Sequence, residues 1–224
     1  MSPTLAERLA AVQERVAVAA SANGRDVTDI TTIVVTKFHP ASLVRSLYEL
    51  GVRDVGESRH QEAAGKAGEL GDLQLTWHFV GQLQSKKARQ ALEYTSVVHS
   101  LDRTSLVDAI SGSGRIIDGF IQLNLTDDPA RGGVQPDLVE SFAESVLASG
   151  AIRLRGLMAV APLGTPPRAA FQRVRALSDR LTALAPEATA LSIGMSGDFA
   201  EAIAEGATHL RIGTAITGNR PVPG

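Results

Sequence analysis

The segment Thr31 to Pro40, TTIVVTKFHP, decides the fold that we expect for this chain. Five consecutive β-branched residues, at positions 32–36, predict a strand that is buried on both faces, as the strands of parallel sheets are. Lys37 follows at the carboxyl end of this strand. Pro40 cannot continue a strand but suits the first turn of a helix, which Gly51 would end. The segment therefore predicts a strand, a lysine, a short loop and a helix.

The position of Lys37 makes it a candidate for chemistry. In α/β proteins the carboxyl ends of parallel strands face the ligand site. A lysine amine can form a Schiff base where its surroundings keep it neutral, and a half-buried strand end with few acids nearby favours this. The alternative is a surface lysine whose amine reaches solvent, which is the more common arrangement. Patterns further along the chain favour the chemical role.

Composition excludes several classes of protein. The 224 residues include 22 Lys and Arg residues against 24 Asp and Glu residues. This balance, without a basic stripe interleaved with aromatic residues, argues against nucleic acid as a partner. The absence of cysteine excludes disulfides, thiolate nucleophiles and cysteine-ligated zinc. The first twenty residues lack the apolar core of a secretion signal and no segment is long enough to cross a membrane, so we expect a soluble cytoplasmic protein.

Strand and helix patterns alternate along the rest of the sequence. An opening helix, which Gly24 ends, precedes the first strand. Further strands are expected at Arg53 to Glu57, Thr76 to Gly81, Val97 to Leu101, Asp118 to Leu125, Arg153 to Val160, Ala190 to Met195 and His209 to Gly213. The helix after the third strand is expected at residues 82–92. Asp102 is the expected cap of the helix after the fourth strand, and Asp198 with Glu201 predicts a capping box after the seventh.

This alternation predicts an α/β fold, a single (β/α)8 barrel of the TIM type with an extra N-terminal helix, spanning residues 1–224 as one domain. The structural alternative is an open doubly wound sheet. However, the GxGxxG motif of such sheets is missing, and the glycine-rich stretches follow the seventh and eighth strands instead of the first.

The glycine-rich stretches predict a phosphate site. IGMSGD, residues 193–198, contains the Ser196 hydroxyl, and RIGTAITG, residues 211–218, contains Gly213 and the Thr214 hydroxyl. Barrels of this type often bind phosphate with the loops after their last two strands, where glycine lets the backbone approach the ligand closely. Each stretch alone would be an ordinary turn. Together, and opposite a lysine at a strand end, they indicate a phosphate-binding site.

Arg211 lies inside the predicted eighth strand, between Leu210 and Ile212, where its charge needs a partner or an opening to water. The alternative to a ligand role is a salt bridge to an acid on a neighbouring strand. A lysine, a phosphate site and an inward arginine match the needs of pyridoxal 5'-phosphate (PLP), which are an imine, an anion site and a partner for the pyridine nitrogen. The histidines have no metal-ligand spacing, so we expect no metal site. His78 is expected to be a hydrogen-bonded core residue. His39, two residues after Lys37, is expected to face solvent from a loop, with contact to the site as the alternative.

The sequence resembles the pyridoxal phosphate homeostasis protein family, of the YggS/PROSC type, nearly from end to end. The matching stretches are VVTKFHP, GVRDVGESRHQE, WHFVGQLQSKK, VVHSLDR, RGLMAVAP, LSIGMSGDFAEAI and HLRIGTAITG. The resemblance implies a fold-type III barrel like the N-terminal domain of alanine racemase, with PLP held as a Schiff base on Lys37. The other positions that it implies for the cofactor site are Ser58, Met195, Ser196, Arg211, Gly213 and Thr214.

The resemblance also implies a role for most of these positions. Ser196 and the backbone around Gly213 and Thr214 would hold the phosphate, Met195 would lie beside the cofactor, and Arg211 would face the pyridine nitrogen. An arginine stays charged and can only donate hydrogen bonds, so it holds that nitrogen unprotonated and weakens the ring as an electron sink.

The tyrosines of the chain point away from robust catalysis. Racemases with the same arginine use two positioned bases, one of them a tyrosine from a second domain. Tyr48 and Tyr94 both lie in helix-like stretches, and the sequence up to Gly224 leaves no room for such a domain. We therefore expect a monomer that holds PLP for its intracellular homeostasis and supplies it to other proteins, including apo PLP-dependent enzymes. The alternatives are a slow PLP-dependent amino-acid racemase or lyase with Lys37 as its base, and an apo scaffold with a vestigial site.

The chain departs from the usual family pattern at some positions. Ser58 and Lys86 stand where asparagine is common, Arg131 where lysine is common, and Thr217 where phenylalanine is usual. None of these positions coincides with Lys37, the serine of the phosphate loop or the inward arginine. We therefore expect cofactor binding to be retained, while the finer roles of these loops do not carry over.

Overall fold

The computed structural model describes residues 3–126, 128 and 131–220, so the two ends of the predicted 1–224 domain lie outside the described residues. Within the described part, eight parallel strands form a closed barrel in which each strand pairs with the next and β8 pairs with β1. The strands are β1 (Thr31–Val35), β2 (Asp54–Glu57), β3 (Thr76–Phe79), β4 (Val97–Leu101), β5 (Ile117–Gln122), β6 (Ile152–Met158), β7 (Ala190–Ser192) and β8 (His209–Ile212). The predicted TIM-type barrel is confirmed, and the pairing of β8 with β1 excludes an open sheet.

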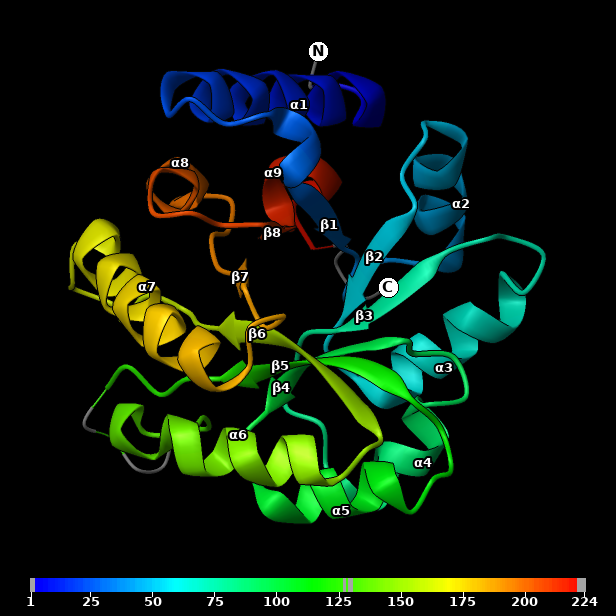
Figure 1. The fold of residues 1–224 in the computed structure, drawn as a ribbon. Coiled ribbons are helices and arrows are strands. Elements are labelled where there is room, and N and C mark those ends of the chain that lie inside the picture. The colour runs from blue at the N-terminus through cyan, green and yellow to red at the C-terminus, as the bar shows by residue number, and fades with distance from the viewer. Residues whose placement is uncertain (1–2, 127, 129–130, 221–224) are drawn as a thin grey trace.

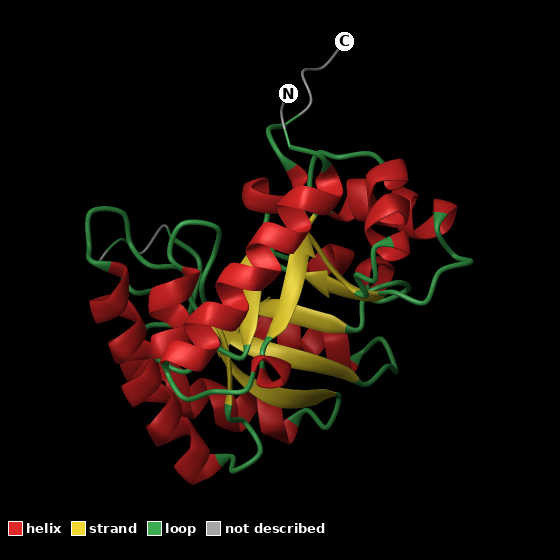
Figure 2. Cartoon of the chain, turned by 90° about the horizontal axis from the view of Figure 1, so that it is seen from above, coloured by secondary structure: helices red, strands yellow, loops and turns green. Residues whose placement is uncertain are grey.

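Helices surround the strands on all sides (Figure 1, Figure 2). They are α1 (Leu5–Ala22), α2 (Ala41–Glu49), α3 (His60–Glu69), α4 (Ala88–Ala91), α5 (Thr104–Ser111), α6 (Val139–Ala148), α7 (Pro167–Leu184), α8 (Phe199–Ala204) and α9 (Thr214–Thr217). Short 3-10 turns occur at Val27–Asp29, Ser85–Lys87 and Pro136–Leu138. Helix α1 is the predicted extra helix, and it packs against α8 and α9. In the described residues no helix is long and apolar enough to span a bilayer.

The apolar residues fill two separate regions. The larger cluster lies between the strands and the helices and includes Val34, whereas a smaller cluster of Val97, Phe120, Met158 and Ala190 lies inside the barrel. Ile33 and Val34 are both fully buried although they point to opposite faces of β1. This burial on both faces explains the continuous β-branched sequence of the first strand.

Both predicted helix caps are wrong. Helix α5 begins at Thr104 with Arg103 at its N-cap and no side-chain cap, because the Asp102 carboxylate forms an ion pair with Arg103 instead. Asp198 does occupy the N-cap of α8, but its Oδ1 accepts a hydrogen bond from the Met195 amide at 2.6 Å and caps no helix amide. In both places the carboxylate binds a group that precedes the helix instead of an amide in its first turn.

Some predicted elements are shorter in the structure. Residues 82–92 form a 3-10 turn and the short helix α4 rather than one continuous helix, and β5 ends at Gln122 instead of residue 125. Strand β7 ends at Ser192, because Gly194 adopts a left-handed φ of 92° that breaks the strand. A Cβ at Gly194 would lie 2.7 Å from the Ala202 Cβ, so α8 can pack closely there only against glycine.

Histidines occupy much of the barrel interior. His99 stacks on Phe120 with ring centroids 4.5 Å apart, and the rings of His78 and His209 lie beside it. Burial lowers the pKa of His99 well below its ordinary value and the pKa of His209 to about 4, so both rings are neutral at neutral pH. His78 is buried and hydrogen-bonded, as predicted. His39 was expected to face solvent, but it is buried, with only 9% of its surface exposed.

We expect acid to destabilise the barrel as the pH falls from the ordinary histidine value of 6.5 to about 4. The folded-state pKa of His209 lies below its unfolded value, so the unfolded chain binds more protons over this range and the free energy of unfolding decreases. The loss attributable to His209 is at most about 3 kcal/mol. His209→Gln should remove that share in urea denaturation curves measured from about pH 7 to about pH 4.

The control is His60→Gln, because the His60 ring stacks on Tyr94 outside the barrel interior. We expect this variant to lose stability in acid as the wild-type protein does. If His209→Gln lost stability in acid as steeply as the wild-type protein, protonation of His209 would not be a cause of the loss.

Candidate functional site

The predicted site residues follow four different strands and converge at one end of the barrel. Lys37 follows β1, Ser58 follows β2, Ser196 follows β7, and Gly213 follows β8. Because the strands are parallel and the barrel is closed, their carboxyl ends share one face. The Ala215 amide donates to the Ser196 Oγ at 3.4 Å, which joins the loops after β7 and β8 directly.

We call the face that carries the carboxyl ends of the strands the mouth of the barrel. Lys37 lies at its rim with an exposed side chain, whereas we expected it to be half-buried. Its Nζ lies 5.8 Å from the centroid of the Phe38 ring, and it forms no ion pair with any acid among the described residues. No described salt bridge therefore fixes the position of this side chain. The amine is accessible to a ligand that approaches from solvent.

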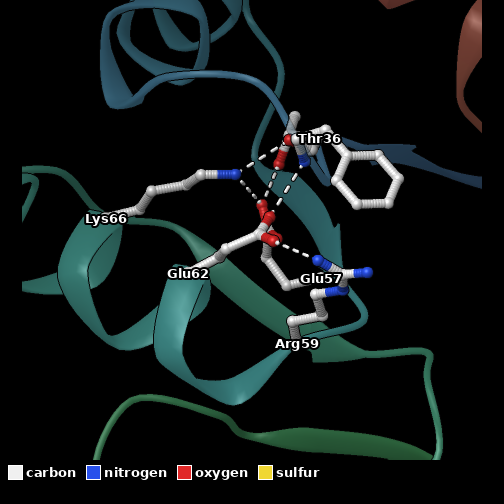
Figure 3. A network of polar contacts seen from close by, with 6 residues as sticks. Thr36, Glu57, Arg59, Glu62 and Lys66 are labelled. Atoms are coloured by element: carbon white, nitrogen blue, oxygen red, sulfur yellow. Dashed lines mark hydrogen bonds and ion pairs between the residues drawn. The ribbon is translucent and has the colours of Figure 1, made fainter. Parts of the chain in front are cut away.

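A buried ion pair fixes the backbone just before Lys37 (Figure 3). The Glu57 Oε1 accepts hydrogen bonds from the Thr36 hydroxyl and from the Lys66 amine, both at 2.6 Å. The same amine donates to the Thr36 carbonyl at 2.8 Å. The Glu57 and Lys66 side chains are only 1% and 8% exposed. Strand β2, helix α3 and the end of β1 are thus held together at the residue that precedes the candidate lysine.

A second contact fixes the backbone just after Lys37. The Phe38 amide donates to the Glu62 Oε2 at 3.0 Å, and Phe38 adopts a φ of 69°, which is uncommon for a residue with a side chain. Such a conformation costs about 1–2 kcal/mol and persists where neighbouring contacts enforce it. The cations of Arg59 and Arg220 lie over the Phe38 ring, at 4.9 and 4.2 Å from its centroid. The lysine therefore lies on a turn that is held at both sides.

Sequence reasoning missed the roles of Glu57 and Lys66. The available signal was an acid at the end of a predicted strand of the barrel, where burial would require a partner. Burial raises the pKa of Glu57, and the hydrogen bonds from Lys66 and Thr36 offset this effect in part. Its Oε2 is buried without a hydrogen-bond partner among the described residues. Glu57 therefore depends on Lys66 to remain ionised inside the protein.

Arg211 lies inside the barrel with 5% of its surface exposed. One terminal nitrogen donates to the Ser192 carbonyl at 2.5 Å and to the Ser192 Oγ at 2.7 Å, and the other donates to the Ala159 carbonyl at 2.9 Å. No described acid pairs with it, so the salt-bridge alternative is not observed in this part of the chain. Burial lowers its pKa to about 10, and the guanidinium stays charged at neutral pH. Three of its five N–H groups are used by these described acceptors, which leaves two for a ligand.

Backbone amides gather at the loops after β7 and β8. The amides of Ser196, Gly197 and Thr214 donate to no acceptor among the described residues. A Cβ built at Gly197 meets nothing within 4 Å, so the space beside this backbone is open. The Ser196 hydroxyl lies at the same place. Backbone N–H groups without partners, beside a serine hydroxyl, are the kind of groups that can bind an anion.

Ser58 lines a cavity of about 520 Å³ beside the mouth, together with Arg59, Phe79 and Lys87. A Cβ at Gly81 would lie 2.4 Å from the Ser58 carbonyl oxygen, so the loop after β3 can approach Ser58 only because this residue is glycine.

The other predicted positions differ in exposure. Met195 is 36% exposed in the loop after β7. Among the departures from the family pattern, Lys86 and Arg131 are exposed and Thr217 is buried. Among the described residues no group of three or more His, Cys, Asp or Glu side chains forms a metal site.

Comparison with known proteins identifies a family and relatives that match over nearly the whole chain. Residues 8–221 match the family described as alanine racemase, N-terminal domain. A pyridoxal phosphate homeostasis protein from Pseudomonas aeruginosa is 41% identical over 225 residues, which cover 97% of this chain and 96% of that protein.

Solved structures show the same architecture. PipY of Synechococcus elongatus, solved with PLP bound, superposes with a TM-score of 0.83 and 36% identity, covering 96% of this chain and 100% of that one. Alanine racemase from Corynebacterium glutamicum is 17% identical, with a TM-score of 0.68, and the match covers 96% of this chain and 62% of that one. At this identity the racemase likeness shows the fold alone.

We expect Lys66→Met to lower the free energy of unfolding by about 3 kcal/mol at neutral pH, because it leaves the Glu57 carboxylate buried without its partner. Adding Glu57→Gln should recover most of that loss, since no uncompensated charge then remains. The folded-state pKa of Glu57 is raised above 4.5, so the penalty is present at neutral pH and disappears as the carboxyl becomes protonated in acid. Urea denaturation of the single and double variants at about pH 7 and about pH 5 measures both effects.

Lys86→Met is the matched control, because this lysine is exposed and its loss should change stability by less than about 0.5 kcal/mol. Equal stability of Lys66→Met and the double variant would show that the ion pair does not support the mouth in this way.

Proposed function

Since the chain belongs to the alanine racemase N-terminal domain family and, within it, to the pyridoxal phosphate homeostasis proteins, we propose that it binds PLP at the mouth of its barrel and serves PLP homeostasis. The convergence of an accessible amine, an anion site and a buried arginine with unused donors carries this proposal. These are the groups that PLP requires, and PipY, a relative of the same architecture, was solved with PLP bound.

The residues present fit the cofactor. PLP supplies an aldehyde that condenses with amines and a pyridine ring that can accept electrons. The Lys37 amine would hold the cofactor covalently as an imine. The Ser196 hydroxyl and the free amides of Ser196, Gly197 and Thr214, with the backbone of Gly213, would bind the phosphate. Arg211 would direct its unused N–H groups at the pyridine nitrogen.

The remaining predicted positions border this arrangement. Ser58 would offer its hydroxyl from the carboxyl end of β2, and Met195 would lie against the ring from the loop after β7. A serine is shorter than the asparagine that is common at position 58. A water molecule would then bridge the contact that an asparagine makes directly.

The groups at the mouth favour holding the cofactor over turnover. Arg211 remains charged and can only donate, so it would keep the pyridine nitrogen unprotonated and the ring a weak electron acceptor. Neither Tyr48 nor Tyr94 is placed to act as the second base that racemases use, since one lies at the other end of the barrel and the other is held protonated by burial. The Arg53 guanidinium, at the amino-terminal end of β2, lies 3.8 Å from the centroid of the Tyr48 ring, and burial raises the pKa of Tyr94 to about 12.

We extend the proposal to the supply of PLP to other proteins in the cytoplasm. Lys37 and Thr214 are exposed at the mouth, so a second amine can reach the covalent bond without unfolding the barrel. An apo PLP-dependent enzyme presents such an amine on its own lysine. Transfer would consist of exchange of one imine for another, with the Lys37 amine as the leaving group.

Borohydride reduction tests the site. We expect the PLP-loaded protein to carry one pyridoxyl adduct on Lys37 in a peptide map by mass spectrometry, and Lys37→Ala to lose both the adduct and the visible absorbance. Lys86→Ala, which removes an exposed lysine in another loop, should keep both. An adduct on another lysine, or none, would refute the proposed site.

Transfer is tested by mixing the loaded protein with an apo PLP-dependent enzyme and following the recovery of that enzyme's activity. We expect recovery with the wild-type protein, and none with Lys37→Ala after removal of free cofactor. Recovery that is no faster than release of PLP into buffer would contradict supply by direct exchange.

The alternative function is a slow amino-acid racemase or lyase in which the accessible Lys37 amine acts as the base. Incubation of the loaded protein with alanine in deuterated water separates the two functions. Because Arg211 weakens the electron sink, we expect exchange of the α-proton at least about 1,000-fold below an ordinary enzyme turnover of about 10 per second. Exchange at enzyme-like rates, measured by proton NMR, would instead establish the enzyme.

A further inference from the structure

A chain of hydrogen bonds crosses the barrel interior and ends at Arg211. The Arg211 guanidinium donates to the Ser192 Oγ at 2.7 Å, and this oxygen lies 2.8 Å from the His99 Nδ1. The His99 Nε2 lies 2.9 Å from the His78 Nδ1, and the His78 Nε2 lies 3.0 Å from the Asp54 Oδ1. Asp54 begins β2 at the opposite end of the barrel from the mouth. Its side chain is 31% exposed, whereas the histidines and the serine are at most 3% exposed.

Arg211 sets the direction of every hydrogen bond in this chain. A guanidinium can only donate, so the Ser192 Oγ accepts from it and has its own hydrogen to give to the His99 Nδ1. Neutral His99 then carries its proton on Nε2 and donates to the His78 Nδ1. His78 in turn carries its proton on Nε2 and donates to the Asp54 carboxylate. With both histidines protonated on Nε2, all five side chains of the chain are paired. Each one donates to the next, from the Arg211 guanidinium to the Asp54 carboxylate.

A protonated His99 would break this order. Its Nδ1 would then donate to the Ser192 Oγ, which would face two donors and have no described acceptor for its own hydrogen. Burial, His78 and the Arg211 charge lower the pKa of His99, in agreement with the neutral ring. Phe120 stacks on His99 with an interplanar angle of 9°, which fixes the plane of the ring.

We propose that Asp54, His78, His99 and Ser192 form a one-way hydrogen-bond relay that positions the Arg211 guanidinium for the pyridine nitrogen of PLP. The inference rests on the cofactor site proposed above and assigns a task to side chains that do not touch the cofactor. Ser192 holds one terminal nitrogen of Arg211 through both its carbonyl and its hydroxyl, so rotation of the guanidinium away from the mouth loses a bond. The histidines keep that hydroxyl turned so that it accepts from Arg211. Asp54 ends the polarised chain with a negative charge.

The tautomers can be measured without the cofactor. Long-range proton–nitrogen correlation spectra of the cofactor-free full chain, labelled with 15N-histidine, should show His78 and His99 neutral with the proton on Nε2 at about pH 7. Ser192→Ala removes the donor to His99 Nδ1 and should shift that nitrogen, whereas Ser192→Thr keeps the hydroxyl and should preserve it. His209→Gln is the control inside the barrel, because the His209 Nδ1 lies 2.8 Å from the Thr208 Oγ1 outside the relay. This variant should leave the tautomers of His78 and His99 unchanged. A protonated ring or an Nδ1–H tautomer in wild-type His78 or His99 would overturn the relay.

The effect on Arg211 is measured with PLP labelled with 15N at the pyridine nitrogen. We expect Ser192→Ala to raise the dissociation constant of PLP about tenfold, the effect of losing one hydrogen bond to a charged group, and to shift the pyridine 15N resonance and the visible absorption maximum. Ser192→Thr should restore all three properties, and circular dichroism should show every variant folded. Unchanged PLP affinity and an unchanged 15N shift in Ser192→Ala would overturn the proposed positioning.

Failure of the two proposals is distinguishable. If wild-type protein binds no PLP, the proposed function fails, and the histidine tautomers of the cofactor-free protein still decide whether the relay exists. If PLP binds through Lys37 while the tautomers differ from those expected, the cofactor site stands and the relay is refuted.

Discussion

Closure of a parallel sheet is the constraint on which the rest of the structure depends. Pairing of β8 with β1, with Thr31 opposite His209, forces the carboxyl ends of all the strands onto one face. A Cβ built at Gly213 would lie 3.7 Å from the Val35 carbonyl oxygen, which brings the loop after β8 against the end of the strand that leads to Lys37. The Lys37 amine and the loops that we propose for anion binding, which are far apart in sequence, thus become neighbours. An open sheet with the same strands would separate them.

Polar networks, rather than apolar packing alone, hold the functional groups at this mouth. Barrel interiors are usually filled with branched apolar residues, yet this one contains three histidines and Arg211 within its described part. Buried polar groups are costly unless every donor and acceptor finds a partner, and a satisfied network rigidifies its surroundings. The Glu57–Lys66 pair holds β1, β2 and α3 together beside Lys37, although the Glu57 Oε2 has no described partner. The histidine relay is paired at each step behind Arg211. The first network fixes the backbone that carries Lys37, and the second fixes the Arg211 guanidinium itself, which suits a protein that must hold one ligand in one orientation.

Short-range patterns in the sequence were sufficient for the architecture. The β-branched segment of β1 and the glycine-containing loops at Gly194 and Gly213 were assigned to their places in the barrel. The capping predictions were wrong because Asp102 and Asp198 bind Arg103 and the Met195 amide, and propensity does not rank such competing partners. His39 was expected in solvent as a loop histidine, but tertiary packing buries it.

The sequence by itself determined the strand order, the barrel and the candidate groups Lys37, Ser196 and Arg211, since periodicity and turn chemistry act between residues close together in the chain. Only the tertiary structure decided that Glu57 pairs with Lys66, and that Ser192 links His99 to Arg211 across 93 and 19 positions of the sequence. A buried polar side chain takes whichever partner the closed barrel brings within about 3 Å, and no local pattern encodes that distance.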